Sequence, residues 1–218
     1  MSDIIVSEIS KSFDGREILH SLSFTVKSGD FLSITGESGS GKSTLLSIMG
    51  GVMRPDKGSV MIGEVDIAAL SEKELAKMRR TKLGFVYQFF NLIPTMTVRD
   101  NILLPLILDG KKTSFYKDKF DELVSFTHLS AVLDSYPHTL SGGEQQRAAI
   151  LRALIHDPEV IFLDEPTGNL DSENAQAVMR LLADLNREFG VTVVQVTHSE
   201  QGAAYGNRVI TIKDGALS

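Results

Sequence analysis

The sequence predicts an α/β protein with a core of parallel strands, a β-rich N-terminal edge and a mostly helical insertion in the middle. Residues 160–163 are apolar throughout, as expected for a strand buried on both faces of a parallel sheet, and residues 191–196 predict a second buried strand. A segment with helical apolar spacing, residues 175–189, lies between them. Strand-like segments dominate the first 62 residues. Alternation of strand and helix in the last third favours a parallel sheet.

The elements follow in order along the chain. Strands are predicted at residues 4–9, 22–26, 31–35 and 59–62, with turn signals at 14–15 and 28–30 and a helix from about 41 to 49. Ser71 and Glu74 form a capping-box pattern ahead of a short helix, and Ser141 and Glu144 form a second one ahead of a helix that ends near residue 157. Residues 97–108 and 115–127 have helical spacing, and a last short strand is expected at 209–212.

These elements predict one domain over residues 1–218. Its core lobe would comprise residues 1–88 and 156–218, and its helical lobe residues 89–155. The basic run of Lys77, Arg79, Arg80 and Lys82 is expected to be a solvated surface.

Composition excludes several classes of function. The chain has no cysteine, so disulfides, thiolate metal sites and cysteine nucleophiles are excluded. Its formal net charge of −6 argues against sequence-independent binding of nucleic acid. Residues 1–9 lack a signal-peptide pattern, and the longest apolar run, residues 102–108, is too short to span a bilayer. A membrane role would therefore require a partner.

The strongest motif fits the phosphate-loop pattern G-x-x-x-x-G-K-S/T. Its glycines allow the backbone to wrap closely around phosphate oxygens, and the helix start after it adds free N–H donors. Lys42 would reach the β- and γ-phosphates, and Ser43 would bind Mg²⁺. The strand before the motif and the helix after it favour this interpretation over an ordinary Gly/Ser-rich turn. The candidate nucleotide-binding residues are Gly36, Glu37, Ser38, Gly39, Ser40, Gly41, Lys42, Ser43 and Thr44.

Two acidic residues follow the apolar run 160–163. Asp164 and Glu165 would lie at the carboxyl edge of the sheet, where ligands bind in open α/β sheets. Asp164 would hold Mg²⁺ through water, and Glu165 would act as general base toward the γ-phosphorus. A strand end turning into solvent is the alternative, and the phosphate loop makes the functional interpretation the stronger one.

A second glycine motif starts a capped helix at Ser141, Gly142, Gly143 and Glu144 and continues to Arg147. A capped helix start with two glycines is a second candidate anion site. With Leu140 in front of it, this segment resembles the signature motif of the ATP-binding cassette (ABC) family. The resemblance spans essentially the whole chain. It implies a P-loop NTPase (RecA-like) core with an antiparallel N-terminal β edge and a helical signature subdomain.

The resemblance assigns further residues. Gln88 resembles the Q-loop glutamine that senses Mg²⁺ and the attacking water, Asp171 the D-loop aspartate and His198 the switch histidine at the γ-phosphate. Phe13 stands where the family places an aromatic ring against adenine, more often a tyrosine. Taken singly, His198 and Gln88 would be structural or surface residues, and burial of Phe13 in the core is an open alternative.

The resemblance also implies ATP and Mg²⁺ as cofactors and a head-to-tail dimer of two identical chains. Ser141, Gly142 and Gly143 of one chain would cover the ATP bound by the phosphate loop of the other. Leu151 and Ser199 depart from the residues usual in the family, and neither change removes a catalytic group. We therefore expect an active ATPase.

The segments 89–98, 136–139 and 166–171 resemble the branch of macrolide exporters, lipoprotein-release ATPases and peptide-resistance exporters. A chain that ends soon after its last strand fits this branch. The resemblance implies a subunit at the inner face of the cell membrane that drives a separate permease by mechanotransmission. Phe89, Phe90, Leu92 and Ile93 would dock that permease, with burial in the helical lobe as the alternative. A regulatory envelope or division-associated ABC ATPase, or a soluble ABC protein acting on nucleic acid or ribosomes, are the alternative functions.

Overall fold

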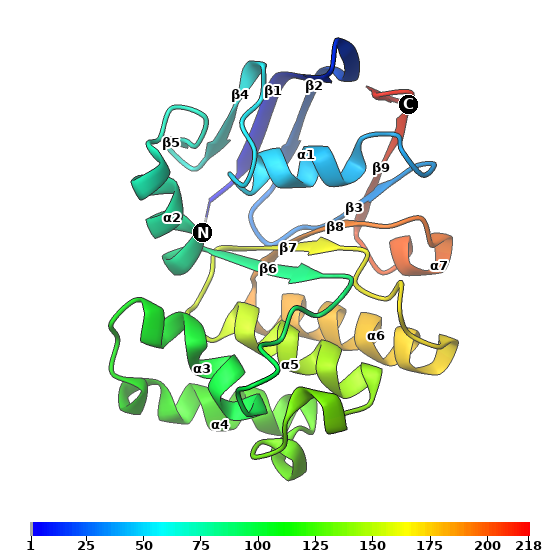
Figure 1. Cartoon of the computed structure of the whole chain (residues 1–218). Coiled ribbons are helices and arrows are strands. Elements are labelled where there is room, and N and C mark those ends of the chain that lie inside the picture. Colours follow the sequence, from blue (N-terminus) through cyan, green and yellow to red (C-terminus); the bar gives the residue numbers. More distant parts are fainter. Residues whose placement is uncertain (1) are drawn as a thin grey trace.

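Two β-sheets and a layer of helices make up the structure, a computed structural model that describes residues 2–218 (Figure 1). The first sheet is antiparallel, with the order β2-β1-β4-β5. Its strands are β1 (Ile4–Phe13), β2 (Arg16–Val26), β4 (Lys57–Ile62) and β5 (Val65–Asp66). A tight turn at Asp14 and Gly15, both with positive φ, joins β1 to β2, as the turn signal predicts.

The second sheet has the order β10-β9-β3-β8-β7-β6. Five of its strands are parallel: β3 (Phe31–Thr35), β6 (Leu83–Tyr87), β7 (Val160–Asp164), β8 (Thr192–Val196) and β9 (Arg208–Lys213). The short β10 (Ala216–Leu217) pairs antiparallel with β9. Every residue of β8 is buried, which confirms the prediction of a strand covered on both faces.

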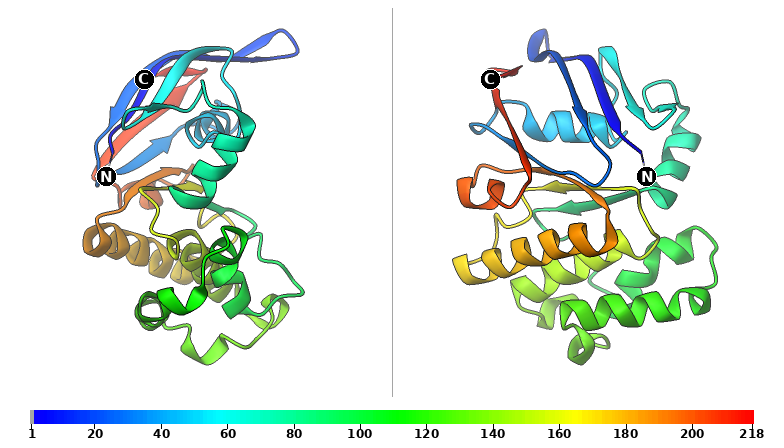
Figure 2. Two further views of the ribbon diagram at one scale, coloured as in Figure 1. Left: turned by 90° about the vertical axis from the view of Figure 1, so that its left-hand side faces the viewer. Right: turned by 180° about the vertical axis from the view of Figure 1, so that it is seen from behind.

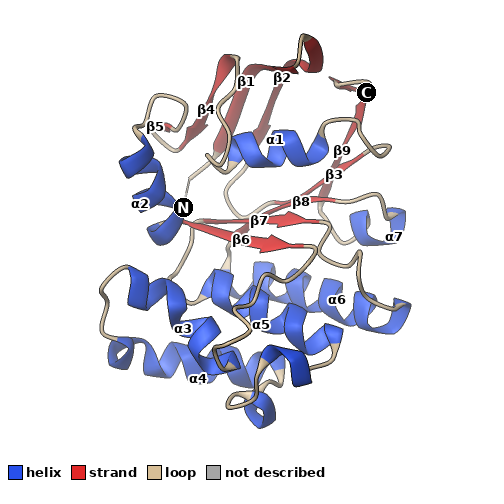
Figure 3. Ribbon diagram, in the orientation of Figure 1, coloured by secondary structure: helices blue, strands red, loops and turns tan. Residues whose placement is uncertain are grey.

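Helices occupy two places (Figures 2 and 3). α1 (Lys42–Met49) lies between the two sheets, and α2 (Glu72–Thr81) follows β5. α3 (Val98–Leu108), α4 (Lys117–Thr127), α5 (Gly142–Leu154) and α6 (Ser172–Phe189) gather on the opposite side of the parallel sheet. The short α7 (Glu200–Ala203) precedes β9, and three 3₁₀ turns, Thr113–Tyr116, Ser130–Val132 and Pro137–Thr139, connect the helices.

Two hydrophobic clusters hold these layers together. Alternate residues of β7 point to different clusters: Val160 and Phe162 pack toward α1 and the antiparallel sheet, and Ile161 and Leu163 pack toward the helices. Burial of both faces explains why the first four positions of the strand, residues 160–163, are all apolar. The parallel sheet is thus the central layer of the fold.

Several predicted elements need correction. β6 was not expected, because no turn residue separates its apolar run from the preceding helix. Its strand character comes from pairing with β7, which the local sequence does not encode. The helix expected at 115–127 begins only at Lys117, after a 3₁₀ turn. The elements β5, β10 and α7 were also not predicted, because they are too short to show a periodic pattern in the sequence.

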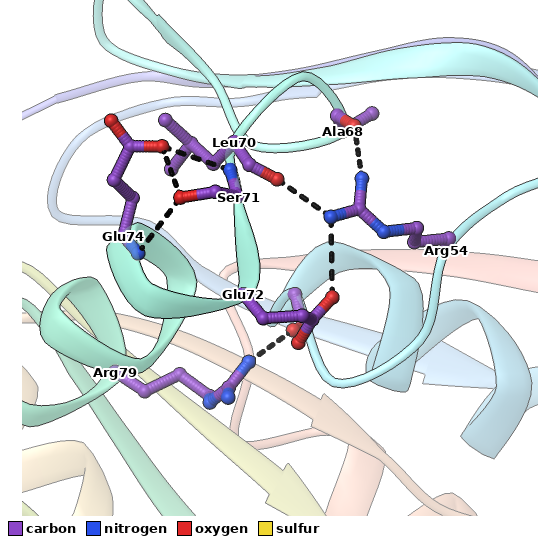
Figure 4. A network of polar contacts seen from close by, with 8 residues as sticks. Arg54, Ala68, Leu70, Ser71, Glu72, Glu74 and Arg79 are labelled. Atoms are coloured by element: carbon purple, nitrogen blue, oxygen red, sulfur yellow. Dashed lines mark hydrogen bonds and ion pairs between the residues drawn. The ribbon is translucent and has the colours of Figure 1, made fainter.

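The basic run is less solvated than predicted. Arg79 reaches inward and donates to the carbonyl oxygen of Gly51; it belongs to the network of polar contacts in Figure 4. In the same network the predicted capping box of α2 is present, with the Ser71 amide donating to the Glu74 carboxylate at 2.9 Å. Arg54 ties the region together by donating to the carbonyl oxygens of Ala68 and Leu70. Among residues 2–218, no helix has the length and apolar character needed to cross a membrane.

Candidate nucleotide-binding site

The loop of residues 36–41 joins the end of β3 to the start of α1, where Gly36 and Gly41 cannot carry side chains. Gly36 has a φ of 145°, and a Cβ there would lie 2.1 Å from the carbonyl oxygen of Ile212. Gly41 has a φ of 97°, and its Cβ would lie 2.6 Å from Leu19 Cδ2. Glycine is therefore required at both positions for this backbone path.

Polar groups of the loop and of β7 already contact one another. Lys42 Nζ donates to the carbonyl oxygens of Gly36 and Glu37 at 2.9 and 2.7 Å. Ser43 Oγ donates to Asp164 Oδ1 at 2.9 Å. This bond joins the start of α1 to the carboxyl end of β7.

The Asp164 carboxyl group lies in an environment that disfavours its charge. Burial is the main cause and raises its pKa, and the nearby Glu165 carboxylate acts in the same direction. The hydrogen bond from Ser43 and the positive charge of Lys42 oppose this rise. A divalent cation beside Asp164 would relieve the repulsion between the two carboxylates.

Glu165 and His198 form a pair across two neighbouring strands. Glu165 follows β7 with a φ of 48°, and its amide donates to the Val196 carbonyl oxygen at 3.0 Å. His198 follows β8, and its Nδ1 lies 3.0 Å from Glu165 Oε2. The Glu165 side chain is 17% exposed and that of His198 is 67% exposed, so the pair opens toward solvent on the histidine side.

Gln88 follows β6, on the far side of β7 from β8. Its Nε2 donates to Asn169 Oδ1 at 3.3 Å, and Asn169 Nδ2 donates to the Gln88 carbonyl oxygen at 2.8 Å. Asn169 was not predicted as a site residue. It stands beside the predicted Asp171 in the same loop, and this proximity is the only signal for it in the sequence.

A cavity of about 540 Å³ lies against the phosphate loop and brings most of the predicted residues together. Phe13 is 42% exposed and lines the cavity, so it is not a core residue. Ile18 on β2 also lines it and was missed, because an aliphatic residue in a strand carries no distinguishing signal. The lining residues are Phe13, Ile18, Ser38, Gly39, Gly41, Lys42, Ser43, Thr44, Gln88, Glu165 and His198.

The second glycine motif lies elsewhere in the same chain. Ser141 caps α5 through a reciprocal capping box with Glu144, in which the Glu144 amide donates to Ser141 Oγ at 3.3 Å and the Ser141 amide donates to Glu144 Oε2 at 2.8 Å. Close packing explains Gly143, because a Cβ there would lie 2.4 Å from Asn174 Oδ1. In the described part of the chain, none of residues 141–144 lines the cavity.

Asp171 caps α6 next to that motif. Its carboxylate accepts the Asn174 amide at 2.9 Å and the Asn174 side-chain amide at 2.7 Å. These hydrogen bonds lower the pKa of Asp171. Like the glycine motif, Asp171 is outside the cavity among the residues described.

The predicted docking residues divide into two kinds. Phe89 is 73% exposed, whereas Phe90 and Leu92 are partly buried against the helical core cluster. Ile93 is also partly buried, and its backbone is held by the buried Asn101, whose Oδ1 accepts the Ile93 amide at 2.7 Å. Phe89 is thus the member that offers a free apolar surface.

The site combines a strand, a glycine-rich loop and the start of a helix with an acidic strand end beside them. This arrangement defines a nucleotide-binding protein of the P-loop class. The family model described as ABC transporter matches residues 19–168, and the chain belongs to this family. It is an ABC ATPase that binds ATP.

Relatives cover most or all of the chain. It is 39% identical to the lipoprotein-releasing system ATP-binding protein LolD of Cytophaga hutchinsonii over 100% of both chains. It is 40% identical to the bacitracin export ATP-binding protein BceA of Halalkalibacterium halodurans, over 100% of this chain and 87% of that protein. A dimeric post-hydrolysis structure of the ATP-binding cassette MJ0796, bound to ADP and Pi, is similar with a TM-score of 0.88 and 40% identity, covering 99% of this chain and 96% of the other. The predicted family and fold class are therefore confirmed.

Proposed function

We propose that this chain hydrolyses ATP to drive an export or release system whose membrane permease is a separate chain. The relatives named for lipoprotein release and bacitracin export support this branch. One observation carries the catalytic part of the proposal: Lys42, Gln88, Glu165 and His198 line a single cavity against the phosphate loop. The geometry supports attack of water on the terminal phosphate of a bound nucleotide.

The roles follow from the positions of the polar groups. Lys42 would release the two loop carbonyls and bind the β- and γ-phosphates, so nucleotide would replace existing hydrogen bonds. Glu165 would accept a proton from the attacking water, and His198, 3.0 Å from it, would orient its carboxylate and contact the γ-phosphate.

Mg²⁺ fits the donors that are present. Ser43 and Gln88 line the cavity, and Asp164 Oδ1 lies directly behind Ser43, 2.9 Å from its Oγ. Mg²⁺ takes oxygen ligands, needs only one or two carboxylates and keeps several waters, so a larger acidic cluster is not required. When bound, it would neutralise charge on the phosphates.

Two copies of the chain would complete the site. Residues 141–144 and Asp171 lie outside the cavity of their own chain, in agreement with a role toward the nucleotide of a second copy. The dimeric structure of the cassette MJ0796 supports such an assembly. We further propose that residues 1–88 and 156–218 form the core lobe and residues 89–155 the helical lobe. The permease would bind at the inner face of the membrane through the surface around Phe89.

The test compares Glu165→Gln with wild type in ATP and Mg²⁺, by steady-state hydrolysis and size-exclusion chromatography. We expect the variant to lose hydrolysis by roughly a hundredfold or more and to elute as a dimer in ATP. Glu188→Gln is the matched control, because Glu188 is exposed on α6 and its substitution removes the same charge. Full hydrolysis by Glu165→Gln would refute the catalytic assignment.

A further inference from the structure

The turn after β6, in which Gln88 lies, has an unusual backbone. Phe90 and Asn91 are consecutive non-glycine residues with positive φ values of 59° and 50°. The left-handed region is unfavourable for residues with a Cβ, and Phe tolerates it poorly. Interactions from outside the turn must therefore stabilise this conformation.

Arg152 on α5 supplies such an interaction. Its guanidinium donates to the carbonyl oxygens of Phe90 and Asn91 at 2.8 and 2.6 Å. Both bonds are charge-assisted, and the planar guanidinium can reach two acceptors at once. The helix that begins with the second glycine motif therefore holds the strained part of the turn.

Asn169 holds the other end of the turn. The two hydrogen bonds between Asn169 and Gln88 are reciprocal, one to the Gln88 carbonyl oxygen and one from its side chain. Gly168 allows this approach, because a Cβ there would lie 2.8 Å from Gln88 Nε2. The Gln88 side chain is thus confined where it lines the cavity.

We propose that Arg152 and Asn169 are positioning residues that together fix Gln88 toward the Mg²⁺ site. This inference rests on the proposed function, in which Gln88 acts on Mg²⁺ and the attacking water. In the part of the chain that the structure describes, neither positioning residue lines the cavity, so both act through Gln88. Replacing either residue is therefore expected to change the Mg²⁺ concentration that the protein requires, and not its affinity for ATP.

The experiment determines the half-saturating Mg²⁺ concentration in two ways, from hydrolysis and from the rise in melting temperature with a non-hydrolysable ATP analogue. It compares Asn169→Ala, Arg152→Lys and Gln88→Ala, and both double variants with Gln88→Ala. Lysine keeps the positive charge of Arg152 but lacks the planar guanidinium that donates to the two carbonyl oxygens at once. We expect each positioning variant to raise the half-saturating Mg²⁺ concentration by roughly three- to tenfold, as the loss of one or two hydrogen bonds allows. The KM for ATP at saturating Mg²⁺ should change by less than about twofold.

The double variants decide whether the effect passes through Gln88. Once Gln88 is alanine, adding Asn169→Ala should change the half-saturating Mg²⁺ concentration by less than about twofold. Asn186→Ala is the matched control, because its side-chain amide also donates to two carbonyls, of Gly29 and Val191, far from the cavity. It should lower thermal stability and leave the Mg²⁺ dependence unchanged.

The possible results distinguish a failure of the positioning role from a failure of the proposed function. If Gln88→Ala alters the Mg²⁺ dependence and the positioning variants do not, this inference is wrong and the proposed function stands. Effects that persist in the Gln88→Ala background would also overturn it. If Gln88→Ala itself behaves as wild type, the proposed role of Gln88 fails, and the inference fails with it.

Discussion

Asp164 and Asp56 show how two aspartates of one chain differ in their response to proton binding. Burial raises the pKa of Asp164 above its ordinary value. The hydrogen bond from Lys11 lowers the pKa of Asp56, helped by the bond from the Ser12 amide. Ionisation therefore destabilises the folded chain at Asp164 and stabilises it at Asp56.

Asp164→Asn is expected to raise the melting temperature at pH 7 in the absence of Mg²⁺. A raised folded pKa means that the penalty from Asp164 is absent below its unfolded pKa and fully present above its folded pKa. The gain should therefore shrink as the pH falls through that window. Thermal unfolding followed by circular dichroism between pH 3 and pH 8, a range of about five units around the ordinary carboxyl pKa, measures this.

Asp56→Asn provides the control of opposite sign. Its contribution is present above the unfolded pKa and is lost as the pH falls through the lowered folded pKa, so the variant should melt at a lower temperature at pH 7. Equal shifts in the same direction for both variants would contradict the explanation.

Substitutions at Gly36 and Gly39 distinguish two costs of adding a side chain in the phosphate loop, a steric clash and an unfavourable backbone conformation. Gly36→Ala would push a methyl group into the Ile212 carbonyl and should lower the free energy of unfolding by about 2 kcal/mol or more. Gly39 has a φ of 80° with nothing within 4 Å, so Gly39→Ala should cost only about 1 kcal/mol. Urea unfolding without nucleotide makes the comparison, and similar losses for both variants would contradict it.

Two helices of the chain begin with the same device. α2 and α5 both carry a complete capping box, at Ser71 with Glu74 and at Ser141 with Glu144. Local chemistry is matched in the two boxes. Only the one on α5 is proposed to face a nucleotide.

Ser71→Ala and Ser141→Ala should each lower the free energy of unfolding by about 1 kcal/mol, because each removes a helix cap. Only Ser141→Ala should also lower hydrolysis, by roughly tenfold, since a hydrogen bond to a charged phosphate would be lost. Denaturation and hydrolysis measured on both variants test this. An equal loss of hydrolysis in both would show that the cap acts only through stability.

Elements with a strong local signal could be predicted from the sequence. Both capping boxes, the strand at 31–35 and the helix after the phosphate loop are at the expected places. β6 could not be predicted, because its pairing with β7 joins residues that are far apart in the sequence. Arg152 and Asn169 were missed for the same reason, since their contacts with the turn after β6 span about 60 and 81 positions.

At the scale of the whole molecule, the cavity is open and part of the predicted site is outside it. The resemblance to the ABC family predicted which residues would meet at the phosphate loop. In the structure they meet because β6, β7 and β8 are neighbours in the parallel sheet, so that their carboxyl ends lie side by side. The sequence could not predict from local patterns that α5 and residue 171 would lie away from that loop within one chain.

A shared site predicts that hydrolysis depends on assembly. Specific activity should rise with protein concentration, in proportion to the fraction of dimer, and reach a plateau when dimer formation is complete. Initial rates at saturating ATP and Mg²⁺ over a hundredfold range of protein, roughly from 0.1 to 10 μM, test this. A constant specific activity over that range, from a chain shown to be monomeric by size-exclusion chromatography, would contradict a shared site.

The attachment of Arg152 to the turn after β6 gives α5 the properties of a lever. Ser141 and Arg152 are eleven residues apart, or about 16 Å along a helix that rises 1.5 Å per residue. A tilt of roughly 10° about the Arg152 end would move the Ser141 end by about 3 Å, comparable to the length of a hydrogen bond. Small displacements at the turn could thus make or break contacts at the opposite tip of α5, with the helix acting as a rigid rod.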